Sequence, residues 1–215
     1  MDFETEEQQI EALKKWWKEN VRTIVAGVII GVIVIGGWRF YVDYQRVHAE
    51  YASILYEKIL VTGNKAEEMD QQQTDVNRLL AEYTNTPYAS LAALLMAKYQ
   101  FANGELAKAQ ENLAWVMENS GQPELQFLAR LRMARLFVAI DKHSEALQLI
   151  NVDYPENFTV MFEELKGDIY VMTKDFNNAR AAYDKAILAS SEQPSRWLRL
   201  KREDLGDAQV NEPAA

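Results

Sequence analysis

The residues that could do chemistry in this chain are few, and the densest acidic group is the run FEELKGD. It contains Glu163, Glu164 and Asp168. Two carboxylates that act on a glycosidic bond must face each other across a cleft, whereas acids at this helical spacing share one solvated face. The two histidines, His48 and His143, lie in no ligand or nucleophile motif. The sequence therefore predicts a protein that is not an enzyme and has no metal site and no cofactor.

The amino-acid composition of the chain limits the kinds of molecule that it is expected to bind. The chain has 215 residues, with 32 acidic and 23 basic side chains and a net charge of −9. Such a charge repels phosphate backbones, so nucleic acid is not an expected partner, and no pattern indicates a small-molecule substrate. The absence of cysteine rules out disulfides and a lipid-bearing cysteine. The charge and composition favour an interaction protein.

One apolar run stands apart from this acidic chain. The sixteen residues from Thr23 to Trp38 include nine Val or Ile and no charge, and Arg22 and Arg39 flank them. Sixteen helical residues cover about 24 Å, and the arginines can extend the span toward the roughly 30 Å of a bilayer core by snorkelling. The sequence predicts a transmembrane anchor over residues 23–40.

The flanking charges predict the orientation of this anchor. Four cations precede the span closely, Lys14, Lys15, Lys18 and Arg22, and two follow it, Arg39 and Arg46. Cytoplasmic flanks carry the excess of Lys and Arg, so residues 1–22 form a cytoplasmic tail and the rest of the chain lies outside the cytoplasm. Gly27 and Gly31 form a G-x-x-x-G spacing that would allow a close membrane-helix contact, and a plain lipid-facing helix is the alternative.

Beyond the anchor, helical periodicity continues and then repeats. Apolar residues from Tyr44 to Ile59 predict a long helix that stops near Thr62 and Gly63, and the boundaries within residues 62–86 stay open. Three helix pairs follow, in which Ala109, Ala146 and Ala179 occupy equivalent positions 37 and 33 residues apart. This register resembles the tetratricopeptide repeat, with its period of about 34 residues. The predicted fold is all-α: a single N-terminal transmembrane helix followed by a tetratricopeptide-like helical solenoid.

Together these features resemble the YfgM family, the ancillary subunits of the bacterial SecYEG translocon. The resemblance rests on the anchor exit Gly37-Trp38-Arg39, on the segment NTPYASLAALLMA and on the degenerate repeats. It implies a single-pass protein of the bacterial inner membrane with a periplasmic domain. It also implies the SecYEG translocon and the chaperone PpiD as partners, and a role in passing exported chains to periplasmic chaperones. A self-associating envelope scaffold without client chains is the alternative.

The predicted domains are a tail at 1–22, an anchor at 23–40, a repeat domain at 41–205 and a disordered C-terminal tail at 206–215. In a tetratricopeptide solenoid the first helix of each pair lines a concave face, which could accept an amphipathic helix. The residues predicted there are Leu91, Leu94, Lys98, Phe101, Leu128, Leu131, Arg135, Val138, Met161, Glu164, Asp168, Val171 and Met172. The alternative is that the helix at 44–59 fills this groove itself.

The predicted orientation has a direct test. A reporter that works only after export, fused after Ala215, should be active, and protease added to spheroplasts should digest the repeats. Full protection of the repeats, with a folded and protease-sensitive control digested in parallel, would reverse the assignment.

Overall fold

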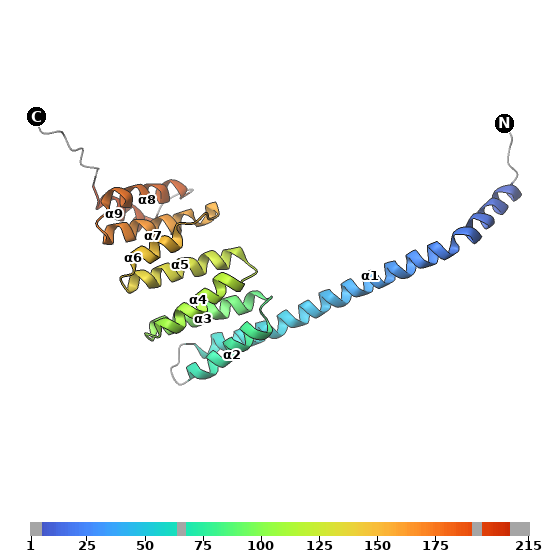
Figure 1. Ribbon diagram of the computed structural model, residues 1–215, viewed down its shortest axis with the longest axis horizontal. Helices are drawn as coiled ribbons and strands as arrows, with labels where there is room; N and C mark the ends of the chain where they lie inside the picture. Colours follow the sequence, from blue (N-terminus) through green and yellow to red (C-terminus); the bar gives the residue numbers. More distant parts are fainter. Residues whose placement is uncertain (1–5, 64–67, 191–194, 207–215) are drawn as a thin grey trace, which may run out of the picture. The chain divides into compact units, whose positions relative to one another are not determined.

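The computed structural model describes residues 6–63, 68–190 and 195–206, and every regular element in these ranges is helical. Figure 1 shows helices α2 to α9 stacked in chain order. The elements are α1 (Glu6–Thr62), α2 (Met69–Glu82), α3 (Pro87–Ala102), α4 (Leu106–Asn119), α5 (Pro123–Ala139), α6 (His143–Ile150), the short 3-10 helix η2 (Glu156–Phe158), α7 (Thr159–Met172), α8 (Phe176–Ala189) and α9 (Arg196–Glu203). The expected all-α class is confirmed.

The chain divides into two compact units, residues 1–51 and residues 52–215. The first unit contains most of α1, which is long and apolar enough to cross a membrane. Every Val and Ile from Val25 to Ile35 is exposed. Exposure of so many large aliphatic side chains on one helix is unfavourable in water and favourable in hydrocarbon. The structure thus fits the predicted anchor, and its membrane boundaries at 23–40 stay a prediction.

The second unit begins with the last turns of α1, which pair with α2. Ala52 and Ile59 are buried against α2 and α3. The side-chain amide of Gln72 on α2 donates to the carbonyls of Ile59 at 3.2 Å and Gly63 at 2.6 Å, so it satisfies acceptors that the helix end leaves open. The solenoid therefore starts with a helix pair that precedes the three pairs predicted from the sequence.

This pairing bears on whether residues 44–59 fill the concave groove. Within the described residues, the buried clusters built on α5 and α7 contain no α1 side chain. Ala52 and Ile59 instead form the first layer of the stack. Ala52 and Ile59 therefore pack on α2 and α3, and whether residues 44–59 fill the groove stays an open alternative.

The three later pairs repeat the same geometry. Ala109, Ala146 and Ala179 are each fully buried, which confirms their equivalent positions in α4, α6 and α8. In each pair the residue that opens the second helix donates its backbone N–H to a carbonyl five residues earlier. These bonds run from Glu105 to Gln100 at 2.8 Å, from Lys142 to Phe137 at 2.9 Å and from Asp175 to Tyr170 at 2.8 Å. The same turn thus closes three helix pairs.

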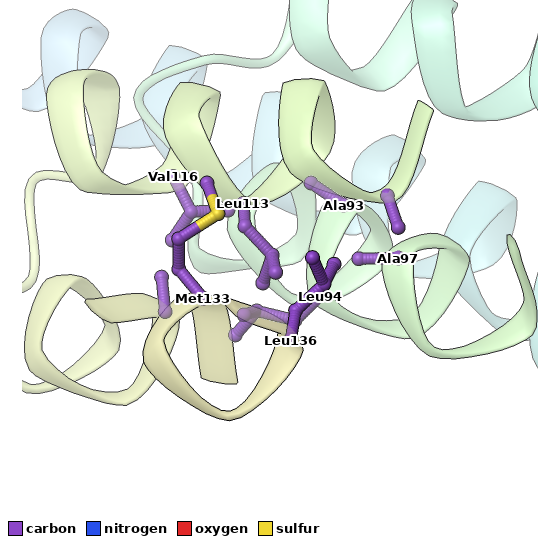
Figure 2. Packing of buried hydrophobic residues seen from close by; sticks show 9 residues of the cluster. Ala93, Leu94, Ala97, Leu113, Val116, Met133 and Leu136 are labelled. Carbon is purple, nitrogen blue, oxygen red and sulfur yellow. The ribbon is translucent and has the colours of Figure 1, made fainter. Parts of the chain in front are cut away.

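A continuous apolar core joins neighbouring pairs. Figure 2 shows Leu94, Leu113 and Leu136, from α3, α4 and α5, pointing toward one another in one cluster. A second cluster joins α5, α6 and α7 through Leu131, Ile150 and Phe162. Each pair therefore completes the core of its neighbour, as the units of a solenoid do.

Helix α9 covers the end of the stack. Leu198 is buried against α8 through Tyr183 and Ala186. The hydroxyl of Ser195 accepts the backbone N–H of Leu198 at 3.1 Å and caps the helix. The disordered tail predicted for residues 206–215 lies outside the described residues except for Gly206.

The close approach of α7 and α8 at Gly167 generates a stability prediction. A Cβ added at Gly167 on α7 would lie 2.4 Å from Cε1 of Tyr183 on α8. That ring is buried, and its hydroxyl donates to Asp168 at 2.7 Å, so it cannot move aside freely. Gly167→Ala should lower the free energy of unfolding by about 1–3 kcal/mol.

The change is measured by thermal melting of the full chain in detergent, followed by circular dichroism. Gly121→Ala is the matched control, because its added Cβ meets nothing within 4 Å. Equal melting of both variants would contradict the close approach of α7 and α8.

Candidate functional site

Three residues predicted on the concave face line one cavity between α3 and α5. Lys98 and Phe101 come from α3 and Arg135 from α5, and the cavity has a volume of about 300 Å³. All three side chains are exposed, Phe101 by 44%. Its other walls are Ala97, Leu113, Arg132 and Leu136. Since Leu113 and Leu136 also belong to the core cluster of Figure 2, the cavity floor is the outer surface of the packed core.

Arg132 is the charged lining residue of this site that the sequence prediction did not include. The predicted pattern assigned Leu131 to the groove, one residue away. Arg132 Nη1 donates to the carbonyl oxygen of Leu94 on α3 at 3.1 Å, so it bridges the two first helices. Burial lowers the pKa of Arg132, and the nearby charge of Arg135 lowers it further. A polar residue in the midst of apolar core positions was the available signal.

The acidic residues predicted on α7 are not free for a partner. Lys201 of α9 donates to Glu164 at 2.8 Å and to Asp168 at 2.9 Å. Burial disfavours the charged Lys201, yet its hydrogen bonds to the two carboxylates outweigh burial and raise its pKa. Asp168 also accepts the hydroxyl of Tyr183. Both acids therefore hold α9 in place, and their use by a partner stays a prediction.

Two predicted groove residues are buried in the core. Leu94 is 3% exposed and Leu131 is fully buried, each inside a cluster that joins two helix pairs. They cannot line an open surface, so their assignment was wrong. The other predicted positions differ in exposure: Leu91, Leu128, Val138 and Val171 are half-buried, and Met161 and Met172 are exposed. Their use by a partner stays a prediction.

The third acid of the FEELKGD run has a structural role. Glu163 is buried at the centre of a polar cluster, where it accepts from Lys166 at 3.0 Å, from Lys185 at 2.9 Å and from the hydroxyl of Tyr154. Burial works against its negative charge, but these hydrogen bonds prevail and lower the pKa of Glu163. The group joins the segment before α7 to α7 and α8. Among the described residues that line the pocket beside Glu163, no second carboxylate is present.

Comparison with known proteins places this geometry in a family. A family model described as tetratricopeptide repeat-like domain matches residues 14–207. The chain belongs to this family. The match includes the apolar part of α1 as well as the solenoid, so anchor and repeats form one family unit. No solved structure matches the chain.

Curated relatives carry a more specific name. A protein of Haemophilus influenzae named "Ancillary SecYEG translocon subunit" is 27% identical over 200 residues, which cover 93% of this chain and 97% of the relative. A protein of the same name from Escherichia coli strain K12 is 28% identical over 187 residues, covering 86% of this chain and 88% of the relative. The resemblance to ancillary translocon subunits is confirmed, and the apolar α1 together with these relatives fits a single-pass membrane protein.

The split between buried and exposed groove positions generates a prediction. Leu131→Glu places an unpaired charge in the cluster of α5, α6 and α7, so it should lower the free energy of unfolding by about 3 kcal/mol or more. Phe101→Glu changes an exposed wall of the cavity and should alter that free energy by less than about 1 kcal/mol.

Thermal melting of both full-length variants in detergent compares the two positions. A folded Leu131→Glu protein with near-normal melting would mean that α5 presents a different face to its neighbours.

Proposed function

We propose that this chain is a membrane-anchored periplasmic interaction module of the protein export machinery. In this role it binds the SecYEG translocon and the chaperone PpiD, and helps to pass exported chains to periplasmic chaperones. The supporting observation is that similarity to proteins named as ancillary translocon subunits extends over 84–93% of this chain and 88–97% of three relatives. Anchor and solenoid are thus shared together, not the repeat fold alone.

The structure supports a binding role on physical grounds. The cavity between α3 and α5 combines an apolar floor with exposed Phe101, Lys98 and Arg135. Exposed aromatic and arginine side chains beside a pocket are typical of protein contact sites. Lysine or tyrosine side chains donate hydrogen bonds to the carboxylates of Glu163, Glu164 and Asp168 within the fold. These carboxylates therefore stabilise the packing of the helices, which supports a binding role and not a catalytic one.

The anchor has a separate proposed role. Gly27 and Gly31 are four residues apart in α1, and an added Cβ at either meets nothing within 4 Å in the described chain. They can therefore accept a close approach from another membrane helix. We assign the span to lateral contact with a membrane partner and the concave face to contact with a soluble one.

Site-specific photo-crosslinking in intact bacterial cells tests this function. A photoreactive residue at Phe101 should form adducts with PpiD, a translocon subunit or an exported chain. The same residue at Glu118, an exposed position on α4, is the matched control and should form few adducts. Adducts at Phe101 only with a second copy of this chain would favour the self-associating scaffold instead.

A further inference from the structure

The cavity between α3 and α5 is surrounded by cations that have no carboxylate partner. Within the described part of the chain, Lys98, Arg132 and Arg135 form no ion pair, whereas Lys58, Lys108 and Lys201 each do. Arg132 is held between the two helices by the Leu94 carbonyl and feels the charge of Arg135. Two guanidinium groups and an ammonium group thus converge on one small site without neutralisation.

This local charge is opposite to that of the whole protein. The chain carries a net charge of −9. On α7 of the same stack, Glu164 and Asp168 are already paired with Lys201. Within the described residues, the α3–α5 site is therefore a local cluster of unpaired cations on an acidic protein, whose net charge repels extended polyanions. A ligand for this site carries its negative charge in a short stretch.

The apolar floor of the cavity indicates that the ligand also has an apolar group. Ala97, Leu113 and Leu136 form it, and Phe101 stands at its edge. A volume of about 300 Å³ is at the lower limit of small-molecule pockets and accommodates one large aliphatic or aromatic side chain with its neighbours. The carboxylates of such a ligand would therefore lie beside its apolar anchor.

We propose that this site binds an acidic amphipathic segment of a partner protein, with one apolar side chain in the cavity and flanking Asp or Glu side chains paired with Lys98, Arg132 and Arg135. The inference rests on the proposed role of the concave face as a docking surface and names its ligand. It favours a protein segment over an anionic membrane surface, because a headgroup would leave the apolar floor unfilled. Binding should weaken as salt rises, since two of the three cations are exposed.

The test uses full-length protein in phosphatidylcholine nanodiscs and fluorescence anisotropy of labelled peptides. One peptide has a single leucine flanked by glutamates in an alanine background, and its partner has glutamines in place of the glutamates. The acidic peptide should bind more tightly than the glutamine peptide. The double variant Lys98→Gln, Arg135→Gln should weaken binding of the acidic peptide by about three- to tenfold, as expected for two partly exposed ion pairs.

A charge-matched control separates a specific site from general attraction. The double variant Arg196→Gln, Arg199→Gln removes two exposed cations of α9, which form no ion pair within the described residues, and should leave peptide affinity unchanged. Thermal melting checks that both double variants remain folded. Equal affinity for the two peptides, or equal weakening by the two double variants, would overturn the inference.

Two further outcomes show whether the acidic-segment inference or the proposed docking function has failed. If photo-crosslinks from Phe101 to an export partner persist in the Lys98→Gln, Arg135→Gln variant, the acidic-segment inference fails while the proposed docking function stands. If the cations instead mediate binding to added phosphatidylglycerol vesicles and not to the acidic peptide, the site recognises a membrane surface and the inference is overturned.

Discussion

The close approach of paired helices, made possible by small residues, is the constraint on which the rest of this fold depends. Ala109, Ala146 and Ala179 are fully buried at the same place in three successive pairs. In the third of these pairs, Gly167 of α7 also leaves room for the ring of Tyr183, where even a methyl group would overlap it. Larger residues there would separate the helices of a pair and open the core between pairs. The packing of successive helix pairs therefore depends on these small residues.

Much of this arrangement was predictable because its physical basis is local in sequence. The register of the alanines predicted the helix pairs, and Pro87 and Pro123 occupy the first turns of α3 and α5, where proline is tolerated. The repeated turn was harder to recognise. Its left-handed residue is Gly104 in one copy, but Asp141 and Lys174 in the other two, so only the first copy has the glycine that adopts this backbone without steric cost.

The candidate site was only partly predictable, because the side chains that were wrongly assigned or missed are placed by contacts between residues far apart in the sequence. Counting along α5 could not show that Leu131 faces α6 and α7 while Arg132 reaches back to α3. Lys201 lies 37 residues from Glu164 and 33 from Asp168, and no local pattern links them. The predicted groove residues therefore differ in charge: Glu164 and Asp168 are paired with Lys201 of α9, while Lys98 and Arg135, like the neighbouring Arg132, have no carboxylate partner within the described residues. The sequence pattern had predicted one mostly apolar groove along all three first helices.

The side chain of Gln72 has a consequence for the time order in which the chain folds. From α2, its amide donates hydrogen bonds to carbonyl groups at the end of α1. These carbonyls therefore have their partner as soon as α2 has formed. Each later pair likewise rests on the pair before it. A chain made of such near-neighbour contacts has a low contact order and can fold progressively from its first pair onward. Such a solenoid can grow one pair at a time during synthesis, without waiting for its C-terminus.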